Sequence, residues 1–377
     1  MIYFDNNATT ALAPEAEEAM AAAARICGNA SSVHSAGREA RRLLNEARER
    51  VASLLKAPES SLTFTSGGTE SINAAMLGVF LPAQGPRHLI ISSVEHSAVL
   101  KTAEFLEGLG VRVSRLGVDA EGRLDLEELE ASIRPETKLI AVMFANNETG
   151  NLHPVKRIGE IARAKGIPYL CDAVQAVGRL ELDLNLLPID MLAASAHKFH
   201  GPKGVGLLYC KKGLELTPLI HGGRQERGHR AGTENIPGIV GMAKALELAQ
   251  SRLLREERRI AGLRDKLQAG LAERIPGLQI NGDVEHRVAN TLNFRVPGVS
   301  GETLLMNLDM AGIAVSVGAA CDSGSLEPSH VLKAMGQGDE EALEGVRVSL
   351  SRYSSEAEVE EFLRVLPGLV EKIRSAA

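Results

Sequence analysis

The chain has 377 residues, of which 44% are hydrophobic and 24% are charged, and its formal net charge is −6. At about 150 residues per domain, this length predicts two or three domains. A nucleic-acid-binding surface needs a basic face and stacking aromatic side chains, so an acidic chain without Trp argues against direct nucleic-acid binding.

The sequence predicts neither a membrane span nor a secretory signal. Its longest apolar run covers 139–145, far below the roughly 18 residues that suggest a spanning helix. The first residues lack the basic start and apolar stretch of a signal peptide. The cysteines are widely spaced, which favours neither a disulfide framework nor a structural zinc site; they are Cys27, Cys171, Cys210 and Cys321. We therefore expect a cytoplasmic protein.

Predicted helices and strands alternate over the first part of the chain. An amphipathic periodicity indicates a helix over 37–56. Short apolar runs predict strands at 62–65, 88–92, 139–144, 169–171 and 191–194. Helices are predicted between them at 97–109, 125–133 and 155–165. This alternation is typical of crossover connections, so we expect an α/β fold with a largely parallel sheet and helices on both faces.

The pattern changes near residue 235. A long helix is predicted over 236–274, and a smaller α+β pattern follows, with strands at 289–296 and 346–350 and helices at 302–312 and 356–374. We place the domain boundary near residue 250. The large domain then covers 15–250, and a smaller domain combines 1–14 with 251–377.

Lys198 follows the predicted strand at 191–194 and precedes a glycine-rich turn. Desolvation at the end of a buried strand favours the neutral amine, which can add to a carbonyl group. The pattern therefore suggests a Schiff-base lysine, although a single lysine in this position is more often an ordinary surface residue. His197 and His200 do not indicate a metal site, because no third ligand has suitable spacing.

Asp172 ends another apolar run, at the sheet edge where ligands of open α/β folds bind. A carboxylate there could keep a pyridinium nitrogen protonated, with Gln175 near the hydroxyl group of the ring. Taken alone, Asp172 fits the N-cap of a helix equally well.

The segment 65–73 joins a strand end, two glycines and the start of a helix. Free backbone N–H groups and the helix dipole suit a phosphate group, and Thr69 adds a hydroxyl. An amine, a carboxylate and a phosphate site at three strand ends are together what pyridoxal 5′-phosphate (PLP) requires.

The sequence resembles the cysteine desulfurases of the NifS/IscS type, which belong to the class V aminotransferases among the fold type I PLP enzymes. The similarity runs nearly end to end, and its motifs occur in the family's order and spacing. They lie at 3–10, 65–73, 94–99, 146–150, 171–176, 195–206, 230–235, 319–325 and 347–352. The resemblance implies a large domain with a mainly parallel seven-stranded sheet flanked by helices, plus a smaller α+β domain.

The resemblance also implies the cofactor site. Lys198 would form the Schiff base, Asp172 would bind the ring nitrogen and Gln175 would lie by the phenolic oxygen. His96 matches the ring-stacking histidine, and imidazole can also transfer protons near neutral pH. The expected phosphate ligands are Gly68, Thr69, Ser195 and His197, with Thr233 reaching the phosphate of the partner subunit in a homodimer.

For the substrate, the resemblance implies that Arg347 and Asn147 bind the α-carboxylate of L-cysteine, because a guanidinium fork fits that planar anion. Asn6 and Asn7 are expected to border it. Taken alone, Arg347 could equally form a surface ion pair.

Cys321 decides the expected reaction. It lies among small residues that we expect to form a mobile loop, as a nucleophile that visits two partners needs. By composition it could also be an inert buried thiol, the commoner state of free cysteine. The resemblance implies desulfuration of L-cysteine to L-alanine, with a persulfide on Cys321 that passes to an iron–sulfur scaffold protein or another acceptor. It implies no permanent metal, although Cys321 could transiently bind a nascent cluster.

Two other functions remain open at this stage. One is another enzyme on the same scaffold, such as an aminotransferase or a selenocysteine lyase. The other is a non-catalytic scaffold with a vestigial cofactor pocket, against which the intact amine, carboxylate, phosphate and thiol positions argue. The physiological acceptor and any accessory activator cannot be named from the sequence.

Overall fold

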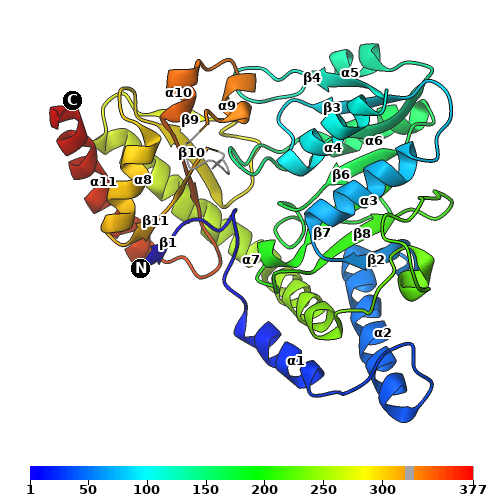
Figure 1. The fold of residues 1–377 in the computed structure, drawn as a ribbon. Helices are drawn as coiled ribbons and strands as arrows, with labels where there is room; N and C mark the ends of the chain where they lie inside the picture. Colours follow the sequence, from blue (N-terminus) through cyan, green and yellow to red (C-terminus); the bar gives the residue numbers. More distant parts are fainter. Residues whose placement is uncertain (319–326, 377) are drawn as a thin grey trace.

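A seven-stranded sheet forms the centre of the larger part of the molecule (Figure 1). The computed structural model describes residues 1–318 and 327–376. The strand order is β2-β8-β7-β6-β5-β3-β4, and every neighbouring pair is parallel except the two that β8 makes. The strands are β2 (Leu62–Thr65), β3 (His88–Ser92), β4 (Arg112–Leu116), β5 (Thr137–Ala141), β6 (Tyr169–Asp172), β7 (Met191–Ser195) and β8 (Gly206–Cys210).

Helices cover both faces of this sheet, which confirms the expected architecture. Neighbouring residues of β3 belong to different cores: Ile90 packs into one, and Leu89 and Ile91 into the other. The central strands are therefore apolar on both faces, as parallel sheets require. The helices of this part are α1 (Pro14–Ala24), α2 (Ser35–Leu55), α3 (Gly68–Phe80), α4 (Ser97–Gly108), α5 (Leu126–Ser132) and α6 (Val155–Ala164).

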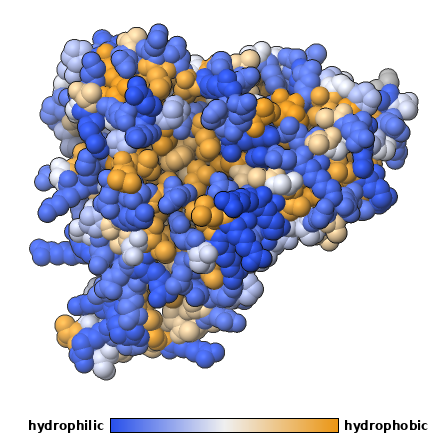
Figure 2. Space-filling view, turned by 180° about the vertical axis from the view of Figure 1, so that it is seen from behind, coloured by the Kyte–Doolittle hydropathy of each residue, from blue (hydrophilic) through white to orange (hydrophobic). Residues whose placement is uncertain are grey.

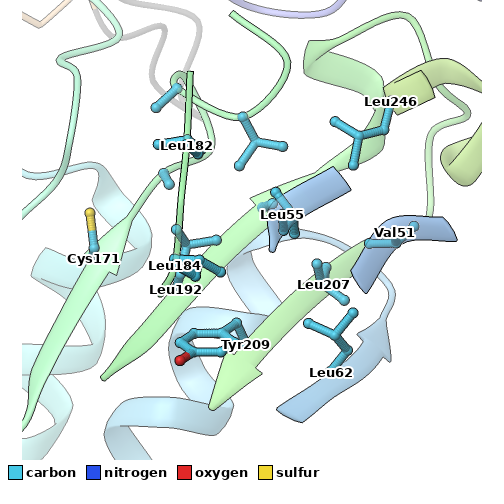
Figure 3. Packing of buried hydrophobic residues seen from close by; sticks show 14 of the residues in the cluster. Val51, Leu55, Leu62, Cys171, Leu182, Leu184, Leu192, Leu207, Tyr209 and Leu246 are labelled. Atoms are coloured by element: carbon cyan, nitrogen blue, oxygen red, sulfur yellow. The ribbon is translucent and has the colours of Figure 1, made fainter. Parts of the chain in front are cut away.

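One of the two cores joins the sheet to α2 and to the start of α7 (Ile236–Arg274). In Figure 3, Val51 and Leu55 of α2 lie beside Leu62 and Leu207 of the sheet, with Leu246 of α7 close by. Burial of such side chains stabilises the fold by roughly 1.5–3 kcal/mol each. Short 3-10 turns complete this part: η1 (Glu59–Ser61), η2 (Ala196–Lys198) and η3 (Gln225–Gly228).

A smaller α+β unit lies to the left in Figure 1 and contains both described chain ends. Its four-stranded sheet has the order β12-β13-β10-β9, and β1 pairs with β11. The strands are β1 (Ile2–Tyr3), β9 (Gln279–Asn281), β10 (Thr291–Arg295), β11 (Ile313–Ala314), β12 (Ser316–Val317) and β13 (Gly345–Ser349). The helices are α8 (Gly301–Met310), α9 (His330–Ala334), α10 (Asp339–Leu343) and α11 (Glu356–Ala376).

Helix α7 connects the two units without a break. Leu248 belongs to the core of the larger unit, whereas Ile260 belongs to the core of the smaller one. The first strand packs with the smaller unit as well, because β1 pairs with β11. The proposed domain boundary near residue 250 lies inside this continuous helix and stays a prediction.

Two strands of the large sheet were not predicted from the sequence. β4 is half-exposed and contains two arginines, so its apolar pattern is weak. β8 lies behind the glycine-rich turn, whose glycines mask the strand signal. The strand expected at 139–144 ends at residue 141, and the chain then turns toward the site described below.

The surface mixes polar and apolar side chains. Seen from behind, apolar residues gather in the wider part of the molecule, which contains the large sheet (Figure 2). Among the described residues, no helix is both long enough and apolar enough to cross a bilayer.

Candidate active site

A cavity of about 400 Å³ lies at the carboxyl ends of the central strands. Strand ends and the turns that follow them contribute most of its lining, as expected for ligand sites of α/β folds. Eleven of the site residues that we predicted from the sequence line this cavity together: Asn7, Gly68, Thr69, His96, Asn147, Asp172, Gln175, Ser195, His197, Lys198 and Arg347.

Lys198 ends the 3-10 turn η2, directly after β7. Its Nζ donates to the main-chain oxygen of Asn7 at 2.5 Å and to that of Ala8 at 2.9 Å. Burial, together with the charges of Arg179 and Arg347, lowers the pKa of Lys198 to about 8. The amine is thus easily deprotonated, as a nucleophilic amine must be.

Asp172 is buried at the end of β6, whereas His96 lies four residues after β3, where it lines the cavity and remains accessible to solvent. Burial raises the pKa of Asp172, while the charges of His96 and Lys198 oppose that rise. Asp172 Oδ1 accepts from the backbone N–H of Val174 at 2.9 Å, so this residue also caps the following turn. His96 is the N-cap of α4, where its Nδ1 accepts from Ala98 N at 3.1 Å. Desolvation by the protein atoms around the cavity lowers the pKa of His96, which favours the neutral imidazole.

The residues of the expected phosphate site lie around the start of α3. This helix begins at Gly68, so its first backbone N–H groups have no partner within the helix. A Cβ on Gly68 would lie 2.6 Å from Cγ2 of Val174, so only glycine fits here without displacement. His197 approaches from the opposite side with its Nδ1 3.1 Å from Thr9 Oγ1, and burial lowers its pKa to about 4. Free N–H donors at a helix N-terminus suit a phosphate, and the donor set therefore fits PLP.

Arg347 reaches the cavity from β13 of the smaller unit. Its Nη1 donates to the main-chain oxygen of Asn147 at 3.1 Å, and its Nη2 pairs with Asp5 Oδ1 at 2.7 Å. The buried Nε has no partner in the described part of the chain. The ion pair with Asp5, which the sequence did not predict, aligns the guanidinium and competes with any carboxylate that it would bind.

Gln175 and Asn7 belong to a hydrogen-bond network that the sequence did not reveal. Gln175 Nε2 donates to the main-chain oxygen of Asn7 at 3.1 Å, and its Oε1 accepts from Arg179 at 2.5 Å. Asn7 Nδ2 donates to Thr291 Oγ1 at 2.8 Å. Asn6 lies outside the cavity lining, since its Nδ2 donates to the main-chain oxygen of Ser349 at 2.8 Å. Arg179 lies in no sequence motif that we recognised, so only the fold reveals its place.

Thr233 does not line this cavity but a separate one. The same segment contains Arg230, whose Nε pairs with Glu70 Oε1 at 3.0 Å in the first turn of α3. Glu226 pairs with Arg48, and both side chains are buried. The segment that precedes Thr233 is thus attached through Arg230 to the first turn of α3 and through Glu226 to α2 of its own chain.

Cys321 lies outside the described residues. Downstream of it, Ser329 Oγ donates to Glu148 Oε2 at 2.5 Å, next to Asn147 of the cavity. His330 Nε2 lies 2.9 Å from the main-chain oxygen of Glu95, the neighbour of His96. The described residues after Cys321 are therefore attached to the cavity wall. Cys171 is buried in β6, and burial raises its pKa well above the ordinary value.

Known proteins are similar to this chain over nearly its whole length. A family model described as aminotransferase class-V matches residues 2–362. The chain is 46% identical to a cysteine desulfurase of Trichormus azollae over 100% of this chain and 94% of the relative. It is 44% identical to the cysteine desulfurase IscS of Clostridium botulinum, strain Hall, over 99% of this chain and 95% of the relative.

A solved structure of a NifS-like protein has the same fold. It superposes with a TM-score of 0.93 at 40% identity and covers 98% of this chain and 99% of its own. Together with the cavity, these similarities establish that the chain belongs to the class-V aminotransferase family and, within it, to the cysteine desulfurases of the NifS/IscS type.

Proposed function

We propose that this chain binds PLP in the cavity and removes the sulfur of L-cysteine, leaving L-alanine and a persulfide on Cys321. The convergence of a readily deprotonated amine, a buried carboxylate and a helix N-terminus in one cavity supports this proposal most strongly. The names of the relatives support cysteine as the substrate.

In this proposal, each part of PLP has its own residues. Lys198 holds the aldehyde carbon, and Asp172 holds the ring nitrogen through its carboxylate. Gln175 lies by the phenolic oxygen and His96 against the ring. The phosphate is bound by the N-terminus of α3 at Gly68 and by side chains of this chain, which are Thr69, Ser195 and His197.

Proton transfer is assigned to Lys198 and His96, whose pKa values are both lowered in the cavity. When bound, PLP supplies an electron-withdrawing ring that stabilises negative charge at the substrate Cα. Lys198 takes and returns the Cα proton, for which a pKa of about 8 is well placed. The neutral imidazole of His96 can accept a proton from the thiol groups that react.

Arg347 and Asn147 orient the substrate. The guanidinium of Arg347 would bind the α-carboxylate, replacing or sharing its contact with Asp5. Because Asn147 O already holds Nη1, the fork enters the cavity in a fixed orientation. Asn7 borders the same space and adds an amide group.

Sulfur transfer requires a thiolate, because the thiol form of cysteine is a poor nucleophile. In this proposal, Cys321 attacks the substrate sulfur, so that an S–S bond forms while the substrate C–S bond breaks. The electron pair of that bond, with a proton, ends on the Cβ of alanine. The two thiols thus become one persulfide and one methyl group, and no external oxidant or reductant is consumed.

We further propose a homodimer in which Thr233 reaches the phosphate of the partner subunit. Its position outside the cavity of its own chain supports this assignment. Mixed dimers test it: one subunit carries Thr233→Ala with Lys198→Ala, and the other is unchanged. We expect the single intact cavity to bind PLP more weakly than in a dimer with Lys198→Ala alone. Equal affinity would contradict the shared site.

The persulfide must pass to an acceptor, for which we propose an iron–sulfur scaffold protein or another sulfur acceptor. During this transfer Cys321 could touch a nascent cluster. We place the reaction in the cytoplasm, because a reducing compartment keeps a nucleophilic thiol free.

Product analysis of a cysteine variant tests the proposed function. Cys321→Ser should retain the visible absorbance of bound PLP but lose sulfide release and alanine formation from L-cysteine. Cys27→Ser is the matched control, because Cys27 is exposed and outside the cavity, and we expect unchanged turnover. Undiminished alanine formation by Cys321→Ser would instead favour chemistry that does not use this thiol. Comparing turnover of L-cysteine and L-selenocysteine then defines the preferred substrate.

A further inference from the structure

Arg179 lies in the turn after β6, between Asp172 and β7, and binds five oxygen atoms with its guanidinium. Its Nη1 donates to Asn7 Oδ1 at 2.7 Å, to Gln175 Oε1 at 2.5 Å and to Asn290 Oδ1 at 3.4 Å. Its Nη2 donates to the main-chain oxygens of Asn6 at 3.1 Å and Lys198 at 3.2 Å. One side chain thus connects the large unit, the N-terminal segment and the smaller unit.

All five acceptors are neutral. Within the described ranges, Arg179 forms no ion pair with a carboxylate, in contrast to Arg347, which pairs with Asp5. Burial and the charge of Arg347 lower the pKa of Arg179 to about 10, so it stays protonated at neutral pH. Arg179 is half-buried, and a charge that is partly removed from water without a counter-ion is costly and acts on other charges nearby.

The charge of Arg179 acts on the amine of Lys198. Both residues bind Asn7, Arg179 at the side-chain oxygen and Lys198 at the main-chain oxygen. Other charged or titratable groups also interact with this amine: Arg347 on β13, the half-buried His197 beside it, Asp172, Asp5 and His96. Of the charges that disfavour the protonated amine, that of Arg179 has the largest effect.

We propose that Arg179 is a positioning residue for the Schiff-base lysine: its uncompensated charge disfavours protonation of Lys198, and its fork fixes Asn7 and Gln175 around the cofactor site. This inference rests on the proposed function, in which Lys198 holds PLP. It assigns two separable roles to one side chain, one electrostatic and one geometric.

Two substitutions separate these roles. Arg179→Gln removes the charge but retains hydrogen-bonding groups, whereas Arg179→Lys keeps the charge but cannot reach five acceptors. Arg157→Gln is the matched control, because Arg157 is an exposed arginine that pairs only with Glu160 in the described part of the chain.

The first readout is the pKa of the Lys198 amine in the full-length protein freed of cofactor, from the pH dependence of acetic anhydride labelling resolved by peptide mass. The parent should titrate near 8. We expect Arg179→Gln to raise that pKa by about one unit, which makes the ratio of protonated to neutral amine about tenfold larger at a given pH. Arg179→Lys and Arg157→Gln should stay close to the parent. The pH midpoint of the visible absorbance of the holoenzyme should shift in the same direction.

The second readout is hydrogen exchange of the peptide that contains Asn6 and Asn7. Both Arg179 variants should speed its exchange severalfold, because both lose contacts to that segment, and Arg157→Gln should not. If Arg179→Gln fails to fold, Arg179→Lys alone still decides the geometric role. An unchanged Lys198 pKa in folded Arg179→Gln, or unchanged exchange in Arg179→Lys, would overturn the corresponding half of the proposal. Because the labelling uses no PLP, a failure of the proposed function is detected separately, as absence of PLP bound to Lys198 in the parent.

Discussion

Gly68 is the position where the structure predicts the effect of a single methyl group most directly. The Cβ of Gly68→Ala would lie 2.6 Å from Cγ2 of Val174, closer than real Cβ contacts allow. Val174 is β-branched and restricted in χ1, so it cannot simply rotate away. Overpacking of this kind costs about 1–3 kcal/mol. Since both residues line the cavity, we expect the dissociation constant of PLP to rise by roughly 10- to 100-fold.

A double-mutant cycle tests this reasoning. Adding Val174→Ala removes the opposing methyl group and should restore most of the lost affinity, with a coupling energy of about 1 kcal/mol or more. Gly67→Ala is the matched control: its Cβ would meet only Ser195 Oγ, at 3.8 Å, so binding should stay within about twofold of the parent. PLP fluorescence titration measures the parent, the Gly68→Ala and Val174→Ala single variants, their double variant and the Gly67→Ala control. Parent-like affinity in Gly68→Ala, or no rescue by Val174→Ala, would refute the steric argument.

Three further outcomes follow from the same contacts. Arg347→Lys should raise KM for L-cysteine at least about tenfold in steady-state kinetics, because a lysine cannot replace the bidentate fork; an unchanged KM would remove Arg347 from the substrate site. Only the neutral amine of Lys198 adds to an aldehyde. The rate of PLP uptake by cofactor-free protein should therefore rise about tenfold per pH unit below pH 8 and level off above pH 8. An uptake rate that does not depend on pH would contradict the lowered pKa of Lys198. Arg48→Met leaves Glu226 buried without its ion-pair partner and should lower the free energy of unfolding by about 3–5 kcal/mol in urea denaturation. Arg42→Met removes only exposed ion pairs, with Glu39 and Glu46, so the free energy of unfolding should stay close to that of the parent.

Local sequence signals were sufficient to predict much of the fold and site. The lysine after β7 and the aspartate at the end of β6 could be placed at a sheet edge because buried apolar runs mark those strands. The glycine pair before α3 marked a helix start in the same way. These patterns involve residues that are close together in the sequence, so they can be recognised without knowledge of the fold.

Contacts between distant segments could not be predicted in this way. Asp5 and Arg347 pair across 342 positions of the chain, and no local pattern indicates that they meet. Arg179 belongs to no recognised motif, because its importance comes from acceptors on four separate segments that only the fold brings together. The seventh strand, β8, was also missed because the preceding glycines obscure its start.

The most direct test of the account is to find where PLP is attached. The purified protein, loaded with PLP, is reduced with borohydride, digested and mapped by peptide mass spectrometry. We predict that the cofactor is linked to the peptide containing Lys198 and that Lys198→Ala abolishes this linkage. Reduction that leaves Lys198 unmodified, or that links the cofactor to a different lysine, would contradict the central claim.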